Sequence, residues 1–133
     1  MIVVDAGALV EVVLRTDAGR RVRTVLLGDD AFAPDLLDAE CLAVLTRAAR
    51  RGLISGADLR ERVDLVRTAV IERLSSRSLL PGALRFTAAL SGYDALYAAA
   101  ADALSCPLVT TDAGLAATAA GQFGLTVTHV PPG

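Results

Sequence analysis

The sequence predicts an α/β fold with a mostly parallel central sheet and helices on both faces. Short apolar runs that suit buried strands alternate with longer segments in which apolar residues recur at helical spacing. This alternation is typical of strands joined by helical crossovers, which produce parallel pairing. At 133 residues the chain has room for one hydrophobic core, so we expect a single domain over 1–133.

The first part of the chain predicts two strands and three helices. The run "IVVD" at 2–5 suits a buried strand and leads into a helix that reaches about residue 15. A second helix is expected from 18 to 27, with Asp17 as a plain cap. "AFA" at 31–33 predicts a brief strand. After it, Pro34 and Asp35 open a long helix that Gly52 ends.

The rest of the chain continues the alternation. "SGADLRERVDLVRTAVIERL" predicts a helix capped by Ser55, whose last few residues turn into a strand. Four further elements are expected: a short helix at 81–90, a helix at 91–104, a strand "PLVTT" and a small helix at 113–120. "LTVTHV" predicts the last strand.

Composition excludes several classes of protein. All 13 basic residues are arginine, so neither a P-loop nor a response-regulator receiver domain, which need lysine, fits. No G-x-G-x-x-G follows a strand, and a haloacid-dehalogenase-like phosphatase would want an acid where Gly7 stands. His129 is the single histidine, which argues against zinc, and Cys41 and Cys106 fit reduced core thiols. Without a signal peptide or an apolar run of membrane length, a cytoplasmic protein is expected.

Four acidic residues are expected at one edge of the sheet. Asp5 ends the first strand, Asp112 ends "PLVTT", and Asp94 begins the helix that leads back to that strand. Glu40 falls in the second turn of its helix, close to the helix start at a rise of about 1.5 Å per residue. In such folds the carboxyl ends of the strands and the starts of the following helices form the ligand-binding edge.

Each acid also has a purely structural interpretation. Asp94 stands three residues after Ser91, a near match to a capping box, and Asp5 or Asp112 could simply cap the helix that follows. Glu40 fits this interpretation least, because no basic residue lies three or four positions away to compensate its charge.

Together the four carboxylates would repel one another and raise some of their pKa values, and a divalent cation would relieve this. Oxygen ligands without nearby cysteine or histidine favour Mg²⁺ or Mn²⁺. Such ions promote phosphodiester hydrolysis by lowering the pKa of the attacking water and neutralising charge on the leaving oxygen.

At these residues the sequence resembles the PIN-domain ribonucleases, and in particular the VapC-type toxins of bacterial toxin–antitoxin pairs. The resemblance covers nearly the whole chain and rests on four segments: "IVVDAGALVE", "DLLDAECLAVLTRAARRG", "LLPGALRFTAALSGYDALYAAAADAL" and "CPLVTTDAGLA". It implies a PIN-like three-layer sandwich and a Mg²⁺- or Mn²⁺-dependent endoribonuclease, with Asp5, Glu40, Asp94 and Asp112 as the catalytic and metal-binding acids. Thr110 matches the family's T-x-D and could contact a ligand, or could be an ordinary strand threonine.

The resemblance also implies an RNA substrate, a small cognate antitoxin that covers the site, and a homodimer, with no membrane association. One departure is Gly7, which stands where the family often has Ser or Thr. The alternative is a non-catalytic PIN-like module that only binds partners. Net charge is −2, so RNA must be held locally; the arginines near helix ends, such as Arg15 and Arg47, are most simply a solvated face. Few aromatic residues are available for stacking, which favours recognition of a folded RNA by shape and phosphates.

Overall fold

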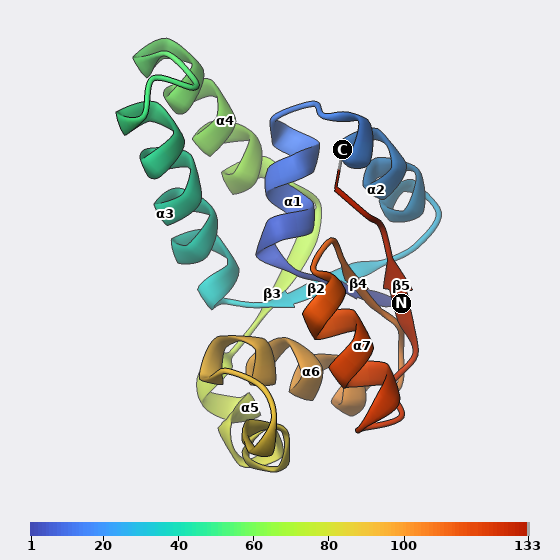
Figure 1. Ribbon diagram of the computed structural model, residues 1–133. Coiled ribbons are helices and arrows are strands. Elements are labelled where there is room, and N and C mark those ends of the chain that lie inside the picture. Colours follow the sequence, from blue (N-terminus) through green and yellow to red (C-terminus); the bar gives the residue numbers. More distant parts are fainter. Residues whose placement is uncertain (133) are drawn as a thin grey trace.

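A computed structural model, described here for residues 1–132, has one five-stranded sheet in which every neighbouring pair is parallel (Figure 1). The strand order is β3-β2-β1-β4-β5. The strands are β1 (Ile2–Val4), β2 (Ala31–Pro34), β3 (Ile71–Leu74), β4 (Leu108–Thr110) and β5 (Val127–His129). The predicted α/β class with a mostly parallel sheet is therefore confirmed.

Helices cover both faces of this sheet, as Figure 1 shows. One layer contains α1 (Ala6–Val13), α2 (Asp17–Leu27), α3 (Leu36–Arg50) and α4 (Gly56–Thr68). The other contains α5 (Ser76–Ala83), the 3₁₀ helix η1 (Leu84–Ala88), α6 (Gly92–Leu104) and α7 (Ala113–Gly121). Among residues 1–132, no helix combines the length and the apolar character that crossing a membrane requires.

The division into two layers follows from the strand order. The chain moves outward from β1 to β2 and β3, and then returns past β1 to form β4 and β5. Right-handed crossovers in opposite directions place their helices on opposite faces of a sheet. The direction reverses between β1 and β4, where Val4 pairs with Val109. Ligands bind at such a switch point, beyond the carboxyl ends of the strands.

The hydrophobic core is centred on β1, β4 and α6. All six residues of the two strands are buried, as a strand covered on both faces requires. Along α6 the four alanines from Ala98 to Ala101 are also buried, so the helix packs closely on the sheet. Cys41 and Cys106 are buried free thiols, as predicted.

Three predicted elements differ from the structure. The cap of α2 is Thr16, whose hydroxyl accepts from the N–H of Gly19, so the assignment of Asp17 as the cap is wrong. The helix expected at 81–90 begins earlier, at Ser76, because the Ser75 hydroxyl caps it. The helix capped by Ser55 ends at Thr68, and the last residues of the predicted segment form the strand β3, as expected.

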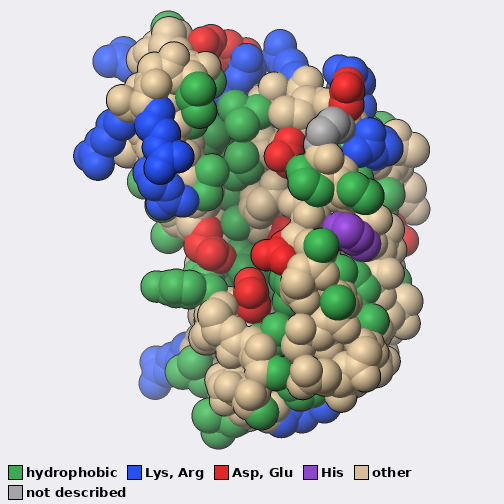
Figure 2. Space-filling view, in the orientation of Figure 1, with side chains coloured by type: hydrophobic (Ala, Val, Ile, Leu, Met, Phe, Trp, Pro, Cys, Tyr) green, Lys and Arg blue, Asp and Glu red, His purple; other side chains and the backbone are tan. Residues whose placement is uncertain are grey.

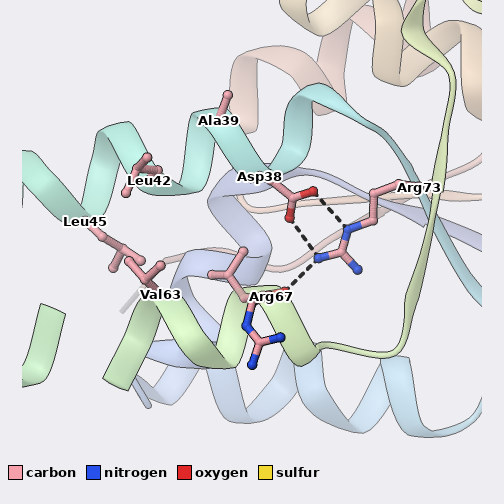
Figure 3. Close-up of a pocket in the computed structure, with 8 residues that line it drawn as sticks. Asp38, Ala39, Leu42, Leu45, Val63, Arg67 and Arg73 are labelled. Atoms are coloured by element: carbon pink, nitrogen blue, oxygen red, sulfur yellow. Dashed lines mark hydrogen bonds and ion pairs between the residues drawn. The ribbon is translucent and has the colours of Figure 1, made fainter. Parts of the chain in front are cut away.

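An apolar groove of about 510 Å³ lies along the contact between α3 and α4 (Figure 3). Leu42, Leu45 and Val63 line it, and Arg73 of β3 lies at one end. Arg73 forms an ion pair with Asp38 at 2.9 Å and donates to the Val66 carbonyl at 2.7 Å. It therefore ties β3 to both helices, and none of the four predicted site acids lines this groove.

Candidate functional site

Asp5 lies at the switch point, where β1 ends and α1 begins. It is the N-cap of α1: Oδ1 accepts from the N–H of Ala8 at 2.8 Å, and Oδ2 accepts from the hydroxyl of Thr110. Only 7% of the residue is exposed. Burial raises the pKa of Asp5 to about 6, even though these two hydrogen bonds lower it. The charges of Asp94 and Asp112 raise it further.

Thr110 joins the ends of the two central strands. Its side chain is completely buried; the hydroxyl donates to Asp5 and accepts from the N–H of Asp112 at 3.0 Å. Asp112 in turn caps α7 by accepting from the N–H of Leu115 at 2.9 Å through Oδ1. Thr110 thus positions both acids, while its predicted contact with a ligand stays a prediction.

Asp94 lies in the first turn of α6, but it is not the cap of that helix. Ser91 is the N-cap, and its hydroxyl accepts from the N–H of Asp94 at 3.1 Å. The Asp94 carboxylate is half-buried, and burial and the charge of Asp112 raise its pKa, against a lowering hydrogen bond from Ser91. By contrast, Asp102 near the end of α6 is exposed and forms an ion pair with Arg85 at 3.3 Å.

Glu40 reaches the same region from α3. The hydroxyl of Tyr97 on α6 donates to its Oε1 at 2.8 Å. Burial raises the pKa of Glu40, the Tyr97 hydrogen bond lowers it, and the charge of Asp94 raises it. Burial and the neighbouring Glu40 also raise the pKa of Tyr97 above its usual range, so the phenol stays protonated and keeps donating.

Sequence reasoning missed Tyr97. It is 2% exposed, and it meets Glu40 from a position 57 residues away in the chain. The sequence feature that could have indicated Tyr97 is its position three residues after Asp94, because this spacing puts the two side chains on one face of a helix.

The four acids act on one another electrostatically. The pKa of Asp5 responds to Asp94 and Asp112, and the pKa of Glu40 responds to Asp94. Figure 2 shows acidic side chains around a hollow between the lobe of α3 and α4 and the lobe of α5 to α7. None of the ion pairs found within residues 1–132 involves these four carboxylates.

The carboxylates are neighbours without forming a closed cage. In this conformation, no three or more His, Cys, Asp or Glu side chains of residues 1–132 have the spacing of a metal site. Asp5 is fixed by two hydrogen bonds, whereas Asp94 is only half-buried and Asp112 is exposed. The role of the four acids as metal ligands stays a prediction.

Comparisons with known proteins agree with this arrangement. The family model of the PIN domain matches residues 2–121. "Ribonuclease VapC9" of Mycobacterium tuberculosis is 35% identical over 96% of this chain and 98% of its own length. "Ribonuclease VapC3" of the same species is 36% identical over 86% of this chain and 85% of its own.

Two solved structures share the fold. FitAcB from Neisseria gonorrhoeae has a TM-score of 0.61 at 17% identity, covering 97% of both chains. PAE2754 from Pyrobaculum aerophilum has a TM-score of 0.57 at 24% identity, covering 87% of this chain and 84% of its own. With the family model spanning most of the chain and similar relatives matched almost end to end, this protein belongs to the PIN domain family, alongside the VapC ribonucleases.

Proposed function

We propose that this chain is the toxin of a toxin–antitoxin pair, an endoribonuclease that hydrolyses RNA phosphodiester bonds with the help of Mg²⁺ or Mn²⁺. The observation that carries the proposal is the buried Asp5, whose pKa is raised to about 6 among three further carboxylates without an arginine partner in the described chain. Similarity to proteins named VapC ribonucleases supports RNA as the substrate.

The donor set fits a hard divalent cation. Asp5, Glu40, Asp94 and Asp112 offer only carboxylate oxygens, the ligands that Mg²⁺ and Mn²⁺ prefer. A cation would offset the charge that burial and mutual repulsion make costly at Asp5. When bound, such an ion lowers the pKa of the attacking water and stabilises charge on the phosphate.

The remaining polar residues hold this acidic site in shape. Thr110 fixes the Asp5 carboxylate and the backbone of Asp112, so the ends of β1 and β4 keep their separation. Tyr97 holds the Glu40 carboxylate from the opposite helix layer. Asp94 is not needed as the cap of α6, because Ser91 serves that role, and Asp112 caps α7 through Oδ1 alone, which leaves its Oδ2 without a hydrogen bond within residues 1–132.

The partners follow from the same relationship. A toxin of this kind needs a small cognate antitoxin to restrain it, and the similarity to VapC proteins supports such a partner. A homodimer is part of the same proposal. We expect one catalytic domain over 1–133, acting in the cytoplasm where its RNA substrate lies.

Two aspartates on α6 allow a matched test. Asp94→Asn should lower Mn²⁺-dependent cleavage of RNA by about 100-fold or more and weaken Mn²⁺ binding in calorimetry, because it removes a carboxylate from the site. Asp102→Asn makes the same change on the exposed part of the helix and should cleave like the unmodified protein. If the unmodified chain neither binds Mn²⁺ nor cleaves RNA, the protein is instead a non-catalytic partner-binding module. If Asp94→Asn binds Mn²⁺ and cleaves RNA as the unmodified chain does, Asp94 does not belong to the site.

A further inference from the structure

Gly7 and Thr111 lie against each other beside Asp5. Gly7 is the second residue of α1, and Thr111 follows the last residue of β4. A Cβ atom added to Gly7 would lie 3.1 Å from Oγ1 of Thr111 and 3.7 Å from Oδ1 of Asp5. The hydroxyl and the carboxylate therefore approach a single point, which a side chain at position 7 would fill.

The two adjacent threonines differ in how their hydroxyls are used. The Thr110 hydroxyl is completely buried and is engaged by both Asp5 and the Asp112 N–H. Thr111 is partly exposed at the edge of the sheet, and its hydroxyl makes no hydrogen bond with any other group of residues 1–132. It therefore retains a donor and acceptor oxygen at the edge of the acidic site.

We propose that the Thr111 hydroxyl is a further oxygen donor to the divalent cation at Asp5, in the space that Gly7 leaves open. The inference rests on the proposed metal-dependent function. Mg²⁺ is bound in some proteins by a Ser or Thr hydroxyl as well as by carboxylate oxygens. Thr111 stands one residue before Asp112 in the chain, and its hydroxyl and the Asp5 carboxylate both lie close to the point that a Cβ atom at Gly7 would occupy.

Gly7 is then required for access. A contact of 3.1 Å is tighter than ordinary packing, so any side chain at position 7 would push the Thr111 hydroxyl aside. The backbone itself does not demand glycine, because Gly7 lies in α1 and has no positive φ. Gly7→Ala should consequently fold well while weakening the binding of the cation.

The test measures Mn²⁺ binding by calorimetry on metal-free protein without RNA. Thr111→Val should weaken binding about fivefold, the effect of losing one polar contact, while Thr111→Ser should bind like the unmodified protein. Thr126→Val, the same change at an exposed threonine before β5, is the control and should have no effect. Gly7→Ser in a Thr111→Ala background should recover most of the lost affinity by supplying a hydroxyl from the other side.

Two results would overturn the inference while leaving the proposed function standing. One is a Thr111→Val variant that binds Mn²⁺ as tightly as the unmodified chain; the other is a Thr111→Ser variant as weak as Thr111→Val. Failure of the proposed function looks different, because the unmodified chain itself would then show no Mn²⁺ binding, and the role of Thr111 would fall with it.

Discussion

At the scale of single residues, Asp5 combines a structural and a chemical task. One carboxylate oxygen caps α1 and the other accepts from Thr110, so each oxygen accepts one hydrogen bond and keeps a lone pair for a further ligand. Burial nevertheless raises its pKa to about 6, which means that the ionised form is held at a cost. A buried carboxylate with a shifted pKa beside other charged groups is typical of a functional site.

The variant Asp5→Asn tests whether the ionised Asp5 carboxylate destabilises the fold, through the pH dependence of the free energy of unfolding. The folded pKa of Asp5, about 6, exceeds the ordinary value of 3.8, so the folded protein binds more protons than the unfolded chain between these values. The free energy of unfolding of the unmodified protein should fall as pH rises through this window. Asparagine keeps the cap without titrating. The stability difference in favour of Asp5→Asn should therefore grow by about 2.4 kcal/mol from pH 4 to pH 7.

Urea unfolding without metal measures this difference. Asp102→Asn serves as the control, because Asp102 is exposed and should show no such trend. A stability difference for Asp5→Asn that stays constant over this pH range would contradict the interpretation.

Residues whose role depends on their neighbours in the chain could be predicted, whereas contacts between distant segments could not. The acids were predictable from their positions at strand ends and helix starts. The hydrogen-bond partners were not, because Tyr97 meets Glu40, and Thr110 meets Asp5, only after the sheet has formed. The sequence left open whether Asp5 and Asp112 are caps or site residues; in the structure both are caps, which leaves the second role possible for each.

At the scale of elements, three copies of "DAG" illustrate what local sequence leaves undecided. Asp5 and Asp112 each cap a helix after a strand, whereas Asp17 is already inside α2 and Thr16 is its cap. The difference comes from the preceding element and not from the preceding residue. Thr16 and Thr111 both offer a hydroxyl, but Thr16 lies between two helices, whereas Thr111 follows the strand β4. A repeated motif thus has two structures, decided by what comes before it.

In the second "DAG", Gly19 lies where only a residue without a side chain fits. A Cβ atom there would lie 1.9 Å from the Glu11 carbonyl oxygen of α1, so Gly19→Ala must separate α1 from α2. We expect it to lower the free energy of unfolding by about 2 kcal/mol or more, the range of overpacked cores. Gly56→Ala is the matched control, since a Cβ atom there meets nothing within 4 Å. If urea unfolding gave the same free energy of unfolding for the two variants, the close approach of α1 and α2 would not contribute to stability.

Elements with strong local signals were predicted well, and junctions were not. The cap at Ser55 and the alanine-rich α6 were predicted from the sequence, and the structure adds Asp58 as the partner that completes a capping box. The start of α5 was missed because Pro81, a common first helical residue, lies inside the helix. Tertiary contacts fix that junction, including the hydrogen bonds of Ser76 to Asp35 across the sheet edge.

At the scale of the whole molecule, the strand order concentrates the acids. Because the chain reverses direction between β1 and β4, Asp5 and Asp112 follow two strands that lie side by side. Glu40 and Asp94 come from opposite layers, so the site depends on the complete sandwich. Binding of Mn²⁺ at this site should therefore change the thermal stability of the whole domain.

Thermal stability with Mn²⁺ should depend on pH. Asp5, Glu40 and Asp94 all have raised pKa values, so a cation must displace protons when the pH falls toward 5. At ten times its dissociation constant, Mn²⁺ should add about 1.4 kcal/mol at pH 7.5. At pH 5, with Asp5 about nine-tenths protonated, the same concentration should add about 0.4 kcal/mol.

Circular dichroism melts with and without Mn²⁺ at both pH values measure this effect as a shift in Tm. The shift should be several degrees at pH 7.5 and small at pH 5, and Asp5→Asn should show little shift at either, because its site has lost the buried carboxylate. An equal Mn²⁺-induced shift at the two pH values would mean that the cation binds away from these acids. A large shift for Asp5→Asn would lead to the same conclusion, since the switch point would then not be where the metal acts.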